Sequence, residues 1–391
     1  MLTLIQGGEV FAPEPLGKKD VLIGGGRVLG LAEPGRLRLQ GLEVEVVEAA
    51  GLMVLPGLVD PHVHILGGGG EGGPATRAPE IRVEDIVSSG VTCLIGCLGT
   101  DGVTRHMSSL LAKAQALELE GVSTFIFSGS YEIPVKTLTG SVRSDLVIID
   151  KVVGAGEIAV SDHRSSQPTF EELARLAAEC RVGGMLGGKA GVLHLHLGDG
   201  KRRLDYLFRL IQETEIPMTQ VIPTHVNRNR GLFQAGLEWV RAGGYIDVTV
   251  GPDPDPESDP EVSREECVSA FLSAGLPVTH LMVSSDANGS LPVFDREGKL
   301  VRLTVASEKD LLRKFHDIVT KEILPLDKAL LIFSANAAGF YKLKDKGRLE
   351  AGADADLILI DDRMSLIAVF ARGRKMMAGR RLLARGTFSE P

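Results

Sequence analysis

Two histidines one residue apart are the first side chains in the sequence that could do chemistry. His62 and His64 close a short apolar run that starts at Leu58, and a glycine stretch at 67–70 follows them. Residues two apart on a β-strand face the same side, so both imidazoles could bind one metal ion such as zinc. A hydrogen-bonded pair of core histidines has the same spacing and is the alternative. The position between an apolar run and a glycine loop favours the metal site.

More metal-ligand side chains stand at the ends of other apolar runs. They are His194, His196, His225 and Asp286. The chain has only nine histidines, so their gathering at such positions is far from random. Nitrogen and oxygen donors without a thiolate suit zinc or a similar divalent ion.

The middle of the chain must position these side chains, and it alternates apolar runs with helical stretches, as βα units do. We predict eight strands, at 57–64, 91–96, 124–128, 157–161, 192–197, 220–224, 245–250 and 281–285. The predicted helices between them include 104–120, 169–181, 205–213 and 231–242. This α/β pattern fits a (β/α)8 TIM barrel, whose active site lies at the C-terminal ends of the strands. An open, doubly wound sheet is the alternative. However, neither a Rossmann G-x-G-x-x-G nor a P-loop stands where a strand meets a helix.

Both ends of the chain contain short strands broken by glycine and proline. Neither end holds enough apolar strand to fold alone, so we predict that the two ends pair into one small β-sandwich. The predicted domains are 1–56 for the first part of the sandwich, 57–344 for the barrel and 345–391 for the second part.

Composition limits the classes of partner. The chain has 391 residues, 44% of them hydrophobic, and a net charge of −8 without a basic cluster, which argues against nucleic acid. No apolar run reaches the roughly 18 residues of a membrane helix, and the N-terminus lacks the features of a signal peptide. The four cysteines show no C-x-x-C spacing. We therefore expect reduced, structural thiols in a cytoplasmic protein without membrane contact.

Six motifs, taken in order, resemble the isoaspartyl dipeptidases of the amidohydrolase superfamily. They are GGGGEGGP at 67–74, SGSYE at 128–132, SDHRS at 161–165, GMLGGK at 184–189, PTHVNRN at 223–229 and SSDANGS at 284–290. The resemblance runs nearly from end to end, and the stretch after Gly347 also looks like the return of that superfamily to its β-sandwich.

The resemblance implies two divalent metal ions, expected to be Zn²⁺. The ligands it implies are His62, His64 and Asp286 for the more buried metal, with His196 and His225 for the second. His194 shares a strand face with His196 and is an alternative ligand. The family pattern selects His196 and places His194 one layer deeper in the barrel.

The family's best-known members bridge the metals with a carboxylated lysine, seven residues before the arginine of the SDHR motif. Counting back from Arg164 gives Glu157. Our hypothesis is that Glu157 bridges the metals without carboxylation; the alternative is that it faces the helices and the site holds one metal. The sequence also carries one extra residue between Tyr131 and Arg164 relative to the lysine form. That residue is expected to form a bulge that brings the backbone closer to the metals.

The resemblance also implies catalytic and substrate-binding roles. A metal-bridging hydroxide attacks the scissile amide, Asp286 carries a proton from it to the leaving amine, and Tyr131 stabilises the oxyanion. The substrate-binding residues it implies are Glu71 for the α-ammonium with the Gly69 and Gly70 backbone beside it, Arg164, Arg228 and Ser290 for carboxylates, and Thr100 in the pocket wall. This set suits a β-aspartyl (isoaspartyl) dipeptide.

Two other functions are compatible with the sequence. One is a cyclic-amide hydrolase of the dihydroorotase or hydantoinase type, and the other is a non-catalytic oligomeric scaffold. The family resemblance also predicts a homo-oligomer, up to an octamer. The acidic segment 251–260 follows the seventh predicted strand, where a lid and a solvated turn are equally compatible with its composition.

Overall fold

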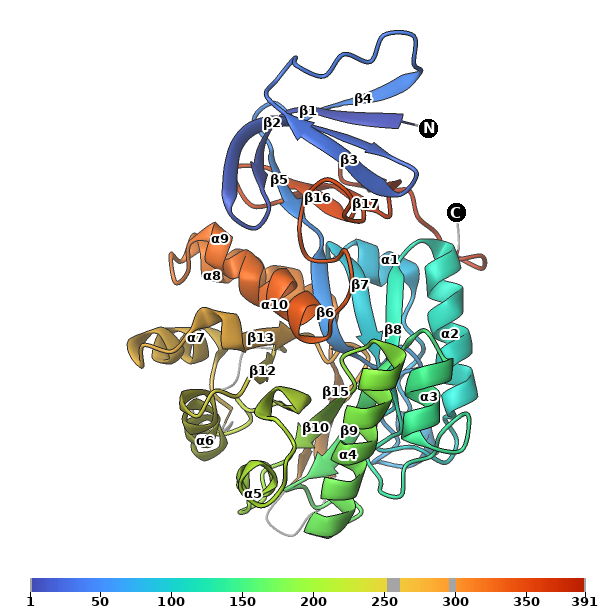
Figure 1. Ribbon diagram of the computed structural model, residues 1–391, viewed down its shortest axis with the longest axis vertical. Coiled ribbons are helices and arrows are strands. Elements are labelled where there is room, and N and C mark those ends of the chain that lie inside the picture. Colours follow the sequence, from blue (N-terminus) through green and yellow to red (C-terminus); the bar gives the residue numbers. More distant parts are fainter. Residues whose placement is uncertain (1, 252–260, 295–299, 390–391) are drawn as a thin grey trace.

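The computed structural model describes residues 2–251, 261–294 and 300–389, without the side chains of 292–294. Nearly all of the acidic segment predicted as a lid or turn therefore lies outside the described residues. Figure 1 shows a parallel sheet surrounded by helices, with a second sheet from both chain ends at one end of it. None of the helices in the described ranges is long and apolar enough to cross a membrane.

The parallel sheet is curled, as in a TIM barrel. Six strands pair in the order β11-β10-β9-β8-β7-β6: β6 (Leu58–Val63), β7 (Val91–Gly96), β8 (Ser123–Ser128), β9 (Val152–Val160), β10 (Val192–Leu197) and β11 (Val221–Thr224). A parallel pair, β12 (Ile246–Thr249) and β13 (Leu281–Ser284), stands between β11 and β6. The N–H of His64 donates to the carbonyl of Ala287 at 2.9 Å, which ties the end of β13 to β6. Each of the eight predicted runs overlaps one of these strands.

The predicted start of the fourth strand at Glu157 is wrong, because β9 begins at Val152. Gly154 and Gly156 make this stretch resemble a loop in the sequence. In the structure they let β9 approach β10 closely. A Cβ on Gly154 would lie 2.4 Å from the Val192 carbonyl oxygen, so the glycine is needed within the strand.

The predicted bulge in this strand is confirmed by the register between β9 and β10. Leu193 pairs with Ala155 and Leu195 pairs with Ile158, so β9 has one residue more than β10 in this interval. Glu157 lies in that interval, in the interior of the strand.

Helices follow the strands and cover the outside of the sheet (Figure 1). Their bounds are α1 Val83–Val87, α2 Met107–Glu120, α3 Val142–Ile148, α4 Phe170–Gly187, α5 Asp205–Glu213, α6 Arg230–Arg241, α7 Arg264–Ser273, α8 Lys309–Thr320, α9 Leu326–Leu330 and α10 Asn336–Phe340. The helix predicted at 169–181 is α4, which continues six residues beyond the predicted end, to Gly187. Thr169 and Glu172 form a capping box at the start of α4, and Gly188 ends it in the left-handed conformation.

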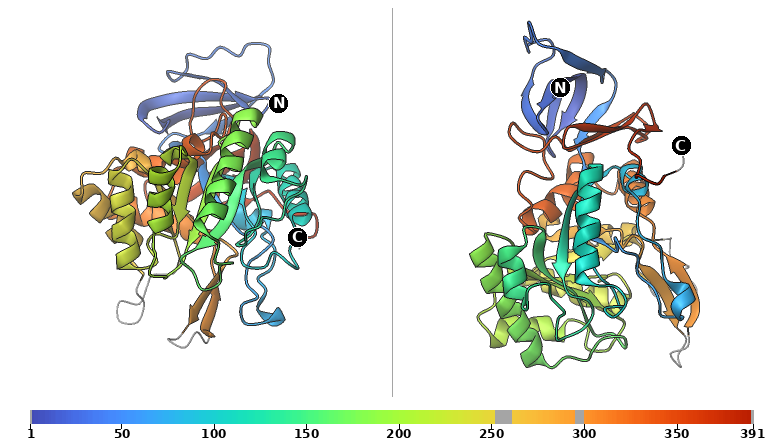
Figure 2. Two further views of the ribbon diagram at one scale, coloured as in Figure 1. Left: turned by 60° about the horizontal axis from the view of Figure 1, so that its bottom comes forward. Right: turned by 90° about the vertical axis from the view of Figure 1, so that its right-hand side faces the viewer.

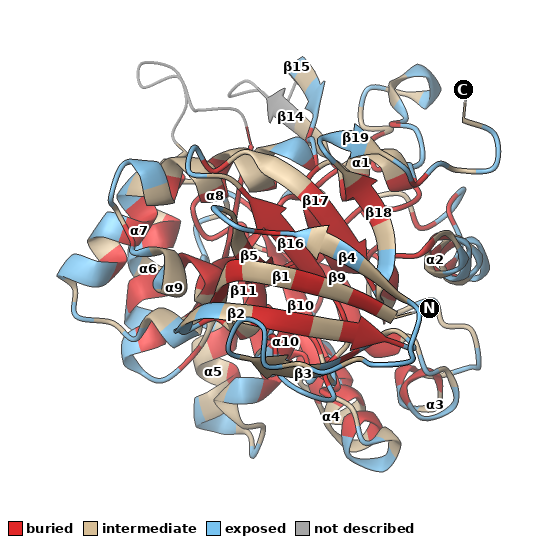
Figure 3. Ribbon diagram, turned by 90° about the horizontal axis from the view of Figure 1, so that it is seen from above, coloured by how far each residue is buried: buried red, intermediate tan, exposed pale blue. Residues whose placement is uncertain are grey.

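Both ends of the chain pair in one nine-stranded mixed sheet, the terminal sheet. Its strands are β1 (Leu2–Phe11), β2 (Pro15–Gly24), β3 (Arg27–Ala32), β4 (Val44–Glu48), β5 (Met53–Pro56), β16 (Leu357–Ile360), β17 (Leu366–Ala371), β18 (Arg374–Ala378) and β19 (Arg381–Leu382). The two ends meet where β5 pairs antiparallel with β16, which confirms that they fold together. Figure 3 looks onto this sheet and shows that most of β16 and β17 is buried.

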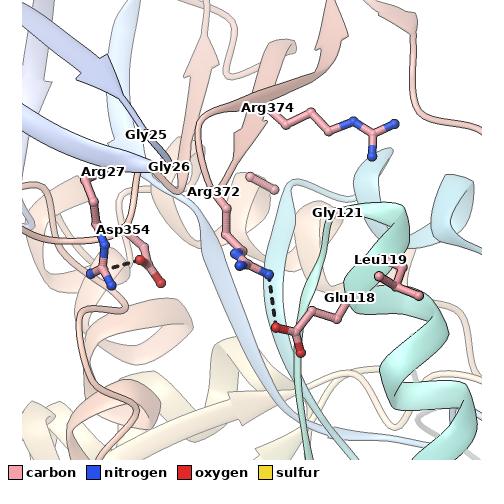
Figure 4. A pocket seen from close by; sticks show the side chains of 10 residues that line it. Gly25, Gly26, Arg27, Glu118, Leu119, Gly121, Asp354, Arg372 and Arg374 are labelled. Carbon is pink, nitrogen blue, oxygen red and sulfur yellow. Dashed lines mark hydrogen bonds and ion pairs between the residues drawn. The ribbon is translucent and has the colours of Figure 1, made fainter. Parts of the chain in front are cut away.

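A groove with a volume of about 470 Å³ lies between the terminal sheet and the C-terminal end of α2. Arg27 pairs there with Asp354 at 3.0 Å, and Arg372 pairs with Glu118 at 3.0 Å (Figure 4). Arg372 therefore joins the terminal sheet to α2, whereas Arg27 joins the two chain ends within the terminal part.

The hairpin of β14 (Ser290–Phe294) and β15 (Leu300–Val305) leaves the parallel sheet just after β13. Figure 2 shows it extending away from the terminal sheet. Because β6 begins two residues after β5 ends, the starts of the parallel strands lie beside the terminal sheet. Their C-terminal ends, with the residues predicted for the site, lie at the hairpin end.

Candidate active site

The six predicted metal ligands come together at the C-terminal ends of the strands. They are His62 in β6, His64 after it, Glu157 in β9, His196 in β10, His225 after β11 and Asp286 after β13. All six side chains are buried. His225 and Asp286 have positive φ angles of 60° and 54°, conformations that non-glycine residues seldom adopt and that are enriched at functional sites.

Glu157 lies between two groups of these histidines. Its Oε1 is 3.3 Å from His64 Nε2. Its Oε2 is 3.4 Å from His62 Nε2, 3.0 Å from His196 Nδ1 and 3.5 Å from His225 Nε2. The carboxylate thus faces the centre of the barrel, opposite to the alternative in which it faces the helices.

Asp286 completes one side of the cluster. Its Oδ1 is 3.0 Å from His64 Nε2 and 3.4 Å from His62 Nε2. Two donors on one zinc ion, each bound at roughly 2.0–2.2 Å, stand about 3.0–3.5 Å apart, so these separations fit shared cations. Glu157 Oε1 and Asp286 Oδ1 are buried without a hydrogen bond from any described residue, which a cation would remedy. The donor set therefore fits divalent metal ions.

The electrostatics of the site agree with metal binding. Burial lowers the pKa of His62 and His225, and it lowers the pKa of His196 to about 3, so these rings are neutral donors. Burial, followed by the nearby Asp286 carboxylate, raises the pKa of Glu157. Burial also acts to raise the pKa of Asp286, but the adjacent imidazoles of His62 and His64 hold it well below its usual value. Two buried carboxylates in mutual repulsion are what a cation stabilises.

A second group of predicted residues surrounds Glu71 beside the metal cluster. Ser290 Oγ donates to Glu71 Oε1 at 2.8 Å, and Thr100 Oγ1 donates to the same oxygen at 3.1 Å. Arg164 Nη1 lies 3.4 Å from it. The other oxygen, Oε2, is buried and has no hydrogen bond from the described residues. Ser290 and Arg164, predicted to hold substrate carboxylates, thus contact Glu71 here.

The guanidinium of Arg164 is largely occupied by Asp162, a residue that our sequence interpretation did not assign. Arg164 Nε is 3.1 Å from Asp162 Oδ1, and Nη2 is 2.8 Å from Oδ2. The same Oδ2 lies 3.0 Å from His196 Nε2. Asp162 therefore orients both a predicted metal ligand and a predicted substrate-binding residue. The signal was present, because Asp162 belongs to the SDHR motif that identified Arg164.

The remaining predicted residues also lie at this end of the barrel. Tyr131 OH is 2.9 Å from His196 Nδ1, and burial raises the pKa of Tyr131, so its hydroxyl stays protonated. Arg228 Nε is buried without a hydrogen-bond partner among the described residues. Gly69 and Gly70 have φ angles of 81° and 111°, which side-chain-bearing residues rarely adopt.

The glycine loop is held by Arg105, which the sequence analysis also missed. Arg105 is buried, and its Nη2 donates to the carbonyl of Gly68 at 2.8 Å while its Nε donates to that of Leu66 at 3.3 Å. An arginine within a polar stretch before a helix gives no sequence signal for this role, because its acceptors are backbone carbonyls.

The cysteines are free and buried, as predicted. Cys97, however, does more than fill the core. Its Sγ lies 3.5 Å from His62 Nε2, in the wall of the metal cluster. Burial, followed by the charges of Glu157 and Asp286, raises the pKa of this thiol. His194 is one layer below His196, as expected, and contacts His62 Nδ1 at 2.7 Å.

Comparisons with known proteins agree with this geometry. The β-aspartyl dipeptidase of Fervidobacterium islandicum AW-1, solved in complex with a β-Asp-Leu dipeptide, is 45% identical in sequence. The match covers 98% of this chain and 97% of that one, with a TM-score of 0.92. A D-hydantoinase from Thermus sp. matches 99% of this chain and 98% of its own at a TM-score of 0.69, but at 15% identity it supports the fold alone.

More distant relatives share the same framework. The adenine deaminase of Halalkalibacterium halodurans is 25% identical over 89% of this chain and 52% of its own length. The dihydroorotase of Methanosarcina mazei is 25% identical over 53% of this chain and 43% of its own. The chain thus spans about half the length of the curated relatives it matches. The pattern of the amidohydrolase family matches residues 53–377, which include every predicted metal ligand. The chain therefore belongs to the amidohydrolase family.

Proposed function

We propose that the protein hydrolyses β-aspartyl (isoaspartyl) dipeptides in a metal-dependent reaction. The observation that carries this proposal is Glu71 beside the predicted metal ligands. Ser290 and Thr100 fix one of its carboxylate oxygens, and the other is buried without a hydrogen bond from the described residues. The similarity to an enzyme solved with β-Asp-Leu, over almost the whole of both chains, supports the same substrate.

The substrate groups find complementary partners in this site. The free Oε2 of Glu71 would accept the α-ammonium of the β-aspartyl residue, next to the open backbone at Gly69 and Gly70. Arg228, with an unused Nε donor, would bind a substrate carboxylate. Asp162 holds Nε and Nη2 of Arg164, so Nη1, which also lies 3.4 Å from Glu71 Oε1, would serve a second carboxylate.

We infer that the site holds two divalent ions, expected to be Zn²⁺. Glu157 would bridge them, because its two oxygens face different histidines. Metal ions in such a site lower the pKa of water and polarise the scissile carbonyl. Asp286 would accept the proton of the attacking water and deliver it to the leaving amine as the amide C–N bond breaks. Tyr131, whose hydroxyl stays protonated, would donate a hydrogen bond to the oxygen that becomes negative.

The same proposal covers the finer architecture. We infer a complete (β/α)8 barrel at 57–344 and a small β-sandwich from 1–56 and 345–391. One hydrophobic core contains residues from both chain ends, among them Ile5, Val21, Leu357 and Phe370, which supports the sandwich. A homo-oligomer is part of the proposal on the family resemblance alone. Location in the cytoplasm is supported by four free cysteines.

The test is steady-state hydrolysis of β-Asp-Leu beside α-Asp-Leu, with zinc-loaded protein. Selective cleavage of the β-linked peptide is expected. Succinyl-Leu, which lacks only the ammonium, should be a poor substrate for the wild type. Glu71→Gln should lose much of this discrimination. Failure to cleave either dipeptide, together with hydrolysis of dihydroorotate or a hydantoin, would replace the proposal with a cyclic-amide hydrolase.

A further inference from the structure

We propose that His194 and Tyr341 form a hydrogen-bonded relay that sets the tautomer of His62 and so prepares it for metal binding. This inference rests on the proposed metal site, and it assigns to two residues outside that site a positioning role.

The relay is a chain of three side chains inside the barrel. His62 Nδ1 lies 2.7 Å from His194 Nε2, and His194 Nδ1 lies 2.8 Å from the hydroxyl of Tyr341. His62 and His194 are fully buried, and Tyr341 is 1% exposed. Each ring nitrogen in this chain must therefore find its partner within the protein, because water has no access to replace one.

The direction of the hydrogen bonds matters for metal binding. His62 Nε2 faces Glu157 and Asp286, so this nitrogen must offer its lone pair to a metal. Its proton then resides on Nδ1 and is donated to His194 Nε2. His194 in turn carries its proton on Nδ1 and donates it to the oxygen of Tyr341. One consistent direction runs through all three groups, and Tyr341 ends it as the acceptor.

Without the relay, the opposite tautomer would be favoured. The two carboxylates beside His62 Nε2, each 3.4 Å away, attract a proton to that nitrogen. A proton there blocks the metal-binding lone pair. A hydrogen-bond acceptor on the other side of the ring counters this attraction, because it stabilises the tautomer that is protonated on Nδ1. His196 has a comparable acceptor, because its Nε2 lies 3.0 Å from Asp162 Oδ2. His225 Nδ1 instead contacts the Thr249 hydroxyl at 2.6 Å, which can donate or accept.

The rings of the relay are held rigidly by elements remote from the site. His194 stacks on Phe127 of β8 with ring centroids 4.5 Å apart and an angle of 19° between the planes. Tyr341 follows α10 directly, and its ring lies 5.7 Å from that of Phe127. Tyr341, near the C-terminal end of the barrel sequence, thus acts through His194 on His62 in β6, the first strand of the parallel sheet.

Zinc affinity, measured by competition with a chelator, tests the relay. His194→Phe keeps the stacked ring but removes both hydrogen bonds, and we expect affinity to fall by about 10–100-fold, as for other partners that orient metal ligands. Tyr341→Phe should weaken binding in the same direction. His194→Gln, whose amide oxygen can accept from His62, should retain most of the affinity. His280→Phe is the matched control, because His280 also stacks on an aromatic ring, at 4.1 Å from Tyr245, away from the cluster.

Wild-type zinc affinity in folded His194→Phe protein would overturn the relay. Equal losses of zinc affinity in His194→Phe and His194→Gln would also overturn it. A second measurement keeps the inference testable if His194→Phe does not fold. Nitrogen-15 NMR of metal-free protein should show His62 protonated on Nδ1 in the wild type and shifted toward Nε2 protonation in Tyr341→Phe. Identical His62 signals would overturn the relay. Failure of the wild type itself to bind zinc would instead refute the proposed metal site.

Discussion

At the scale of single residues, Glu157 decides whether this site works without a carboxylated lysine. Its two oxygens face different histidines, and Oε1 has no hydrogen bond from the described residues. Glu157→Gln keeps the shape but removes the anionic charge. We expect zinc content to fall and β-Asp-Leu hydrolysis to drop by more than the ~10–100-fold that loss of an outer partner costs. Elemental analysis and steady-state kinetics measure both.

Asp247 provides the matched control for that experiment. It is also a fully buried carboxylate of the barrel, hydrogen-bonded by Thr224 and Ser284 at 2.5 and 2.6 Å. Burial raises the pKa of Asp247 well above its usual value, and Asp247→Asn keeps the shape of the side chain. Asp247→Asn should retain zinc and activity. Wild-type zinc content and rate in Glu157→Gln would show that Glu157 is not a ligand.

Asp162 connects the metal cluster to substrate binding. It holds Arg164 through two nitrogens and lies 3.0 Å from His196 Nε2. Asp162→Asn weakens both contacts, so we expect kcat/KM for β-Asp-Leu to fall by about 10–100-fold, with KM raised as Arg164 loses its orientation. Asp150→Asn, at an exposed position, serves as the control. An unchanged KM would mean that Arg164 does not depend on Asp162 for its orientation.

Much of the site could be predicted from sequence because metal ligands have distinctive types and stand at strand ends. His62, His64 and Asp286 follow apolar runs, and parallel strands bring such positions together. Asp162 and Arg105 could not be assigned in the same way. Their partners are Arg164 and the carbonyls of the glycine loop, and these contacts depend on loop conformations that spacing does not encode.

At the scale of elements, β9 shows where prediction of the fold was least accurate. Glycine normally indicates a turn, so the two glycines before Glu157 concealed the first half of the strand. In the structure they are required by the neighbouring strand rather than by a turn. The strands of high apolar content and the start of the helix with a capping box were located well, because burial and capping are local in sequence. The end of that helix was placed six residues too early, because it continues through Gly183 and Gly184.

Gly156→Ala tests this packing. A Cβ at Gly156 would lie 2.8 Å from the Cβ of His194. The expected cost is about 1–3 kcal/mol of unfolding free energy, as for other overpacked sites, with lower zinc content because Glu157 is displaced. Gly30→Ala is the matched control, since no atom lies within 4 Å of its Cβ position. Urea unfolding measures both; equal midpoints for the two variants would contradict the tight approach of β9 and β10.

At the scale of the whole molecule, the two ends of the chain pair in one sheet, and the sequence of the barrel lies between them. The sequence predicted this because neither end has enough apolar strand alone. It could not predict how the terminal sheet is fixed to the barrel. That role falls to Lys346, whose Nζ lies 2.6 Å from Asp354 and 2.7 Å from Asp356, and which also donates to Ser123 at the start of β8.

Lys346→Met should therefore destabilise the whole molecule. Lys346 and Asp356 are buried, at 6% and 4% exposure, so removal of the ammonium leaves a carboxylate unpaired in the interior. The expected loss is about 3–5 kcal/mol of unfolding free energy. Arg348→Met, which breaks an exposed pair with Glu350, should cost less than about 1 kcal/mol. Denaturant unfolding, followed by the fluorescence of Trp239 in the barrel, compares them. Because Lys346 joins the terminal sheet to β8, its loss should lower the midpoint of this barrel signal; an unchanged midpoint would show that the barrel is stable without that attachment.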